Sequence, residues 1–175
     1  MATNTEWALG YLEQAKEDLR ALEMLSAAPG EAKADPSVIC MLLQMVFEKA
    51  AKGALLKFTK TTAKDLIGSH RAATTFMVML KREHKLLARI EEKKPRRVLS
   101  LLPYVRELEE ANPSIAWDKK NRVQLRPQLE YPWEDPATGA IRWPAKNLPI
   151  ANRMRHPNDL IGGRLIKLAQ KFVKL

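Results

Sequence analysis

The stretch that decides the fold is residues 35–58, DPSVICMLLQMVFEKAAKGALLKF. Asp35 is a residue type that caps helix N-termini, and Pro36 suits a first helical turn because its missing N–H is not needed there. Apolar residues then recur every three or four positions, which is typical of a helix face that packs on a core. These residues are Val38, Leu42, Met45, Val46, Gly53 and Leu56, with the stem of Lys49 beside them. We expect a central helix from Pro36 to about Phe58, with Gly53 permitting close approach of a neighbouring helix.

Further helices are predicted on both sides of this segment. Thr3 and Glu6 have the spacing of a capping box, and the apolar pattern that follows predicts a helix over about 5–26. Similar patterns predict helices over 72–90 and 98–111, and a last helix that Asn158 or Asp159 caps. No stretch alternates as a strand would. The sequence therefore predicts an all-α fold, an antiparallel up-and-down bundle of four to five helices, in a single domain over 1–175.

The region between the last two predicted helices has no helical pattern. Residues 112–157 contain seven of the eleven prolines and three of the four tryptophans. We expect a long Pro/Trp-rich loop before the last helix, at about 112–157. Two interpretations of Trp117, Trp133 and Trp143 stay open. They tether the loop to the bundle, or they stack bases beside its basic residues.

The basic charge is concentrated late in the chain. The net charge is +10, and residues 113–175 carry 12 basic and 5 acidic side chains, whereas residues 1–60 carry 7 and 8. This asymmetry favours a polyanionic partner, because clustered Lys and Arg bind phosphates and release counterions. The run Lys93-Lys94-Pro95-Arg96-Arg97 suits a phosphate backbone or an ordinary linker equally well.

Several classes of protein are disfavoured by the sequence. No apolar run reaches the ~18 residues of a membrane span, and the N-terminus does not resemble a signal peptide, so we expect a cytoplasmic protein without membrane contact. The single cysteine, Cys40, excludes an internal disulfide and is expected to be a buried thiol. No Gly-rich phosphate loop, catalytic triad or zinc motif is present, and we expect no metal and no cofactor.

The central helix also carries a recognisable local pattern. It reads Q-x-x-x-E-K-x-x-K-x-x-L, and its members are Gln44, Glu48, Lys49, Lys52 and Leu55. Other features follow in a matching order, namely Ala15 with Asp18-Leu19 early in the chain, His70 before the third helix, and Tyr131-Pro132 late in the chain. In these features the chain resembles the HEPN family, closely over residues 5–90 and loosely beyond.

The resemblance implies a helical bundle that is usually dimeric. HEPN domains either cleave RNA without a metal or bind nucleotides and partner proteins, often in prokaryotic toxin–antitoxin and defence systems. We accordingly expect RNA or a nucleotide as ligand, a homodimer, and a nucleotidyltransferase-type or antitoxin protein as a further partner.

The nuclease motif of the family is incomplete here. In cleaving members an arginine stabilises the phosphate, and a histidine five to seven positions later moves the proton of the attacking 2′-hydroxyl. None of His70, His84 and His156 follows an arginine at that distance. The nearest substitutes are Arg153 and Arg155, which stand too close before His156, and Arg126, which has Tyr131 in the place of the histidine.

Three hypotheses follow. The preferred one is a HEPN-like protein that binds RNA or a nucleotide through a basic C-terminal surface comprising Arg122, Arg126, Tyr131, Arg142, Arg153 and Arg155. The second is a metal-independent endoribonuclease toxin with Arg153 and His156 as catalytic residues. The third is a dimeric protein-interaction module without nucleic-acid binding, which an unused apolar helix face would favour.

Overall fold

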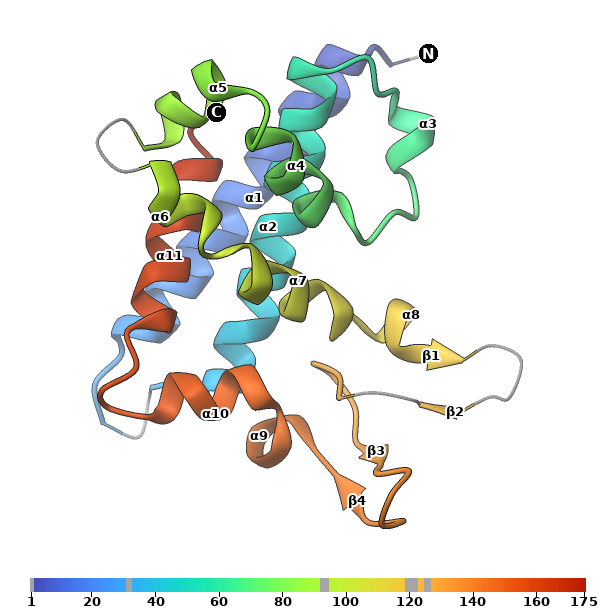
Figure 1. The fold of residues 1–175 in the computed structure, drawn as a ribbon, viewed down its shortest axis with the longest axis vertical. Helices are drawn as coiled ribbons and strands as arrows, with labels where there is room; N and C mark the ends of the chain where they lie inside the picture. Colours follow the sequence, from blue (N-terminus) through green and yellow to red (C-terminus); the bar gives the residue numbers. More distant parts are fainter. Residues whose placement is uncertain (1, 31–32, 92–94, 119–122, 125–126) are drawn as a thin grey trace.

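Two long antiparallel helices form the centre of the fold (Figure 1). The computed structural model describes residues 2–30, 33–91, 95–118, 123–124 and 127–175. Helix α1 (Asn4–Ala27) begins with the predicted capping box, in which the Glu6 amide donates to Thr3 Oγ1 and the Thr3 amide donates to Glu6 Oε2. Helix α2 (Pro36–Phe58) begins at Asp35, whose carboxylate accepts from the Ser37 amide at 2.8 Å. Both predicted helix starts are confirmed.

Gly53 lets α1 and α2 approach closely, as predicted. A Cβ atom at this position would lie 2.7 Å from Leu12 Cγ and 3.0 Å from the carbonyl oxygen of Ala8, both in α1. The two helices are joined further along by an ion pair between Lys49 and the buried Asp18. The α1–α2 pair therefore combines close backbone packing with a charged contact at its edge.

Shorter helices follow α2 along the chain. They are α3 (Ala63–Leu66), α4 (Ala72–Leu80), α5 (His84–Ile90), α6 (Pro95–Leu99), α7 (Leu102–Glu110), α8 (Pro113–Ala116), α9 (Pro144–Asn147), α10 (Pro149–Arg155) and α11 (Ile161–Phe172). Phe47 of α2, Phe76 of α4 and Phe172 of α11 meet edge to face, with ring centroids 5.6 and 5.1 Å apart. This aromatic cluster places the last helix against the central one, and the fold is all-α, as predicted.

Two predicted helices are each divided in the structure. The helix expected over 72–90 ends at Leu80 and resumes at His84, with the exposed charged residues Lys81, Arg82 and Glu83 in the turn between. Hydrogen bonds between residues three positions apart close the turn between α4 and α5. In one of them the Arg82 amide donates to the Met79 carbonyl at 2.9 Å. The helix expected over 98–111 is preceded by α6, which starts at Pro95, and α7 then starts at Leu102 beside Pro103.

The prediction of a long loop at about 112–157 was wrong in part, because the described residues of this region include short helices and two pairs of antiparallel strands. Strand β1 (Trp117–Asp118) pairs with β2 (Val123–Gln124), and β3 (Trp133–Glu134) pairs with β4 (Ile141–Arg142), both antiparallel. Helices α9 and α10 follow, and each begins at a proline. A proline at the first helical position stabilises a helix start, although in sequence it suggests a break.

Candidate functional site

Arg155 is held by the start of α2. Its Nη2 atom donates to both carboxylate oxygens of Asp35 at 2.8 Å, and the guanidinium also donates to Asn152 and to the Ala145 carbonyl. Burial raises the pKa of Asp35, but hydrogen bonds from Arg155 and Ser37 outweigh it and leave the pKa below its ordinary value. The charge of this predicted binding residue is therefore already neutralised within the fold.

Arg153 and His156 line one shallow hollow with Asn152, Asn158 and Asp159. The Arg153 guanidinium donates from Nε to Asp159 at 3.1 Å and from Nη2 to the Tyr104 hydroxyl at 3.1 Å. It also lies 4.7 Å from the centre of the Tyr104 ring. The two predicted catalytic residues thus share a surface, but the arginine is paired with a carboxylate.

Two further predicted binding residues, Tyr131 and Arg142, lie on or near the β3–β4 hairpin. Arg142 donates from Nε and Nη2 to Asp135 at 3.2 and 3.0 Å, and Tyr131 is 59% exposed. Trp133 is buried but does not belong to the described hydrophobic core cluster, whereas Trp143 is partly exposed. Arg122 and Arg126 lie outside the described residues.

The polar residues of the α2 pattern form a largely buried network. Glu48 accepts from Gln44 Nε2 and from Lys52 Nζ, both at 2.8 Å, and lies 3.3 Å from His70 Nδ1. Burial raises the pKa of Glu48, but the hydrogen bond and charge of Lys52 outweigh it and hold the pKa below its ordinary value. Because their hydrogen bonds are made inside the fold, these residues stabilise the bundle.

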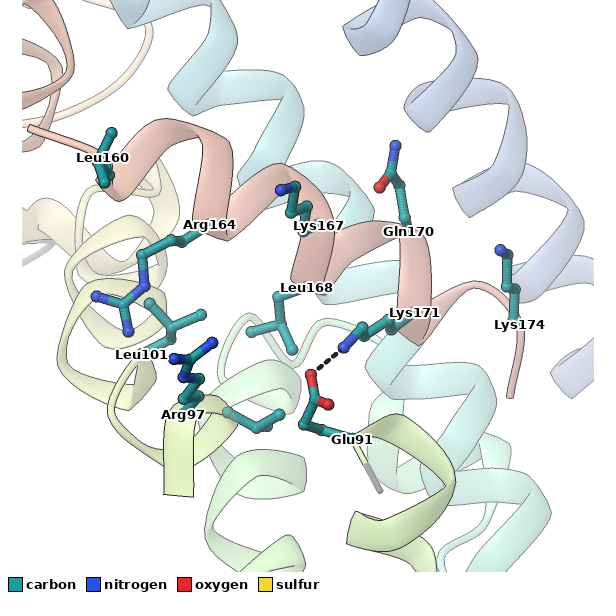
Figure 2. Close-up of a pocket in the computed structure, with 11 residues that line it drawn as sticks. Glu91, Arg97, Leu101, Leu160, Arg164, Lys167, Leu168, Gln170, Lys171 and Lys174 are labelled. Atoms are coloured by element: carbon teal, nitrogen blue, oxygen red, sulfur yellow. Dashed lines mark hydrogen bonds and ion pairs between the residues drawn. The ribbon is translucent and has the colours of Figure 1, made fainter. Parts of the chain in front are cut away.

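A basic groove lies between α6 and α11, and no single segment of the sequence contains it. Its volume is about 690 Å³, within the range of small-molecule sites. We use the name α11 groove for the pocket lined by Glu91, Arg97, Val98, Leu101, Leu160, Arg164, Lys167, Leu168, Gln170, Lys171 and Lys174. Figure 2 shows Arg164 of α11 near Arg97 and Leu101, and Lys171 paired with Glu91 next to Leu168, whereas Lys167 and Lys174 extend away from Arg97 and Glu91.

Positive charge dominates the α11 groove. Its described lining has five cationic side chains and one carboxylate, that of Glu91, which pairs with Lys171. Arg164 donates to the Ser100 hydroxyl at 2.9 Å. In the part of the chain that the structure describes, no carboxylate pairs with Arg97, Lys167 or Lys174. In contrast to Arg153 and Arg155, these cations are available to an anionic ligand.

No family model, curated protein or solved structure matches the chain. Among the described residues, no group of three or more His, Cys, Asp or Glu is placed to hold a metal ion. None of the helices in the described ranges is long and apolar enough to cross a membrane. The function of the α11 groove is therefore inferred from its charges and shape.

One signal of the α11 groove is present in the sequence. Arg164, Lys167, Lys171 and Lys174 follow one another at spacings of three, four and three residues, which places them on one face of a helix. That spacing identifies a basic stripe but not its opposite wall. Arg97 precedes Arg164 by many residues and joins it only when α6 packs beside α11.

Proposed function

We propose that this is a HEPN-like helical protein that binds RNA through the α11 groove. The observation that carries the proposal is the groove itself, a preformed hollow whose described lining has five cations and one carboxylate. Phosphates of RNA are the abundant cellular anions that such a surface attracts, and their binding releases counterions. The HEPN resemblance, carried by the α2 pattern and its order along the chain, supports the same class of ligand.

The arrangement of the cations suits a chain of phosphates better than one isolated anion. Arg164 and Lys167 lie on α11 and Lys174 lies just beyond its last residue, so they offer several contacts in a row. Arg97 adds a guanidinium from the opposite wall, and guanidinium groups bind phosphate through two parallel hydrogen bonds. The lysine ammonium groups also attract phosphate, but their hydrogen bonds are less restricted in direction than those of arginine.

Charge-removing variants test this proposal. We expect Lys167→Gln and Lys174→Gln each to weaken RNA binding and to lower the slope of log affinity against log salt by about 0.7–0.9. Lys64→Gln, which removes the same charge from the exposed surface of α3, is the matched control and should change neither quantity. Fluorescence anisotropy with a labelled RNA at several NaCl concentrations measures both the affinity and its dependence on salt. Binding that is insensitive to salt, or equally weakened by all three variants, would contradict the proposal.

A second candidate function is metal-independent RNA cleavage, because Arg153 and His156 line the same hollow. In this mechanism His156 accepts the proton of a 2′-hydroxyl as its oxygen bonds to the adjacent phosphorus, and the bond to the 5′-oxygen breaks, with that oxygen taking a proton from water. Arg153 exchanges Asp159 for the reacting phosphate. Incubation of the RNA in EDTA, followed by sizing of the products, separates the two functions. Products that His156→Ala abolishes favour cleavage, whereas intact RNA favours binding alone.

A further inference from the structure

The α11 groove differs in shape from a surface that only contacts a phosphate backbone. Its cationic side chains stand around a floor formed by Val98, Leu101 and Leu168, which are buried, and Leu160 lies at its edge with 74% of its surface exposed. A double helix presents phosphates on a convex surface and keeps its bases stacked inside. A duplex therefore cannot place a base against the apolar floor of the α11 groove.

Arg97 and Arg164 add flat surfaces to the same part of the groove. Both side chains are exposed, and Figure 2 shows them close to Leu101 on opposite walls. Guanidinium planes stack on unpaired bases, and aliphatic side chains pack against base faces. Lys167 and Lys174 follow Arg164 in the chain, so both lie on the same side of that base, where they can contact successive phosphates.

We infer that the α11 groove is a subsite for one unstacked nucleotide of single-stranded RNA. The base packs on Leu160 and the planes of Arg97 and Arg164, while Lys167 and then Lys174 contact successive phosphates on one side of it. The inference rests on the proposed RNA binding and adds the form of RNA that is selected. A surface that contacts only phosphates would instead prefer duplex RNA over single-stranded RNA, because the duplex has the higher charge density.

The test compares a short fluorescein-labelled RNA, free or annealed to its complement, by anisotropy in EDTA at one salt concentration. We expect the full-length protein to bind the single strand more tightly than the duplex. We expect Leu160→Ser to weaken single-strand binding about fivefold, the loss of an apolar contact worth part of a leucine side chain, and to leave duplex binding unchanged. Since Leu160 is largely exposed, this change should not disturb folding. Leu9→Ser, at an exposed leucine of α1, is the matched control.

The outcomes separate this inference from the proposed function. A duplex bound as tightly as the single strand, or a Leu160→Ser protein with unchanged single-strand affinity, overturns the nucleotide subsite. If Lys167→Gln weakens binding in those same experiments, phosphate-led RNA binding still holds. If neither form of RNA binds, the proposed function and the subsite both fail.

Discussion

At the scale of single residues, arginines that look alike in sequence have different roles because their partners differ. Arg155 faces Asp35 and fixes α10 to the start of α2, and Arg153 faces Asp159 and Tyr104. Arg164 has a neutral partner, the Ser100 hydroxyl, and lies in a groove rich in other cations. A basic residue is available for a ligand where the fold has not already neutralised it, and only Arg164 of these three meets that condition.

Asp35→Asn tests the structural role of Arg155. Asparagine caps a helix as well as aspartate does, so this change removes the ion pair while it keeps the cap. The folded-state pKa of Asp35 is lowered, so the pair stabilises the protein above the unfolded pKa, and this contribution is lost as pH falls through the folded pKa. We expect Asp35→Asn to lower the free energy of unfolding by about 0.5–1 kcal/mol at neutral pH. Urea unfolding should show this difference shrinking as the pH falls below the ordinary aspartate pKa of about 3.9.

A control separates the pair from the cap in that experiment. Asp35→Ala removes both, and it should lower the free energy of unfolding by about 1 kcal/mol more than Asp35→Asn at neutral pH. An Asp35→Asn protein whose deficit is the same at acidic and neutral pH would show that Arg155 gains nothing from the carboxylate charge.

Glu91 has the opposite role to the cations around it. Its carboxylate pairs with Lys171 inside the α11 groove and so competes with any phosphate for that lysine. We expect Glu91→Gln to raise RNA affinity about threefold at low salt, a gain of the size that one partly exposed ion pair allows. Glu134→Gln, an equal charge change on the exposed side of the β3–β4 hairpin, should raise it less. Anisotropy titrations of both variants measure the difference, and equal gains would assign the effect to net charge alone.

At the scale of helices, the close packing of α1 on α2 depends on Gly53. An added methyl group there would overlap Leu12 and approach the Ala8 carbonyl. We expect Gly53→Ala to lower the free energy of unfolding by about 1–3 kcal/mol, because the two helices must move apart. Gly10, also helical, has nothing within 4 Å of an added Cβ, so Gly10→Ala should raise stability by about 0.5–1 kcal/mol. Urea unfolding of the pair checks the opposite signs, and two stabilised variants would contradict this packing.

The helices also show which parts of the fold could be predicted from the sequence and which could not. Helices α1 and α2 were predicted because their caps and apolar stripes are local signals. The interruption at 81–83 and the helices α9 and α10 were missed, since proline and charged turns do not by themselves show whether a helix ends or begins there. The buried Cys40 was predicted from its apolar neighbours, and burial raises the pKa of its thiol to about 12.

The α11 groove is harder to predict from the sequence than the fold, for a physical reason. Sequence spacing identifies the residues that share one helix face, but the α11 groove has walls from α6 and α11. Ion pairs between distant segments, such as Arg155 with Asp35, also remove charge from a predicted binding surface. Both effects are produced by tertiary packing, which a local pattern does not report.

At the scale of the whole molecule, the cations proposed to bind RNA also repel one another in the folded state. The net charge of +10 and the basic stripe of α11 bring like charges together on folding, and salt screens this repulsion. We therefore expect added NaCl to raise the unfolding temperature while it weakens RNA binding, so that one set of charges has opposite effects on two measurements. The double variant Lys167→Gln and Lys174→Gln should unfold at a higher temperature than the parent protein at low salt and respond less to NaCl. Thermal unfolding at several NaCl concentrations, beside the anisotropy titrations, measures both effects. An unchanged unfolding temperature in the double variant would mean that these lysines are too well solvated to repel, and stability would then not limit how basic this surface is.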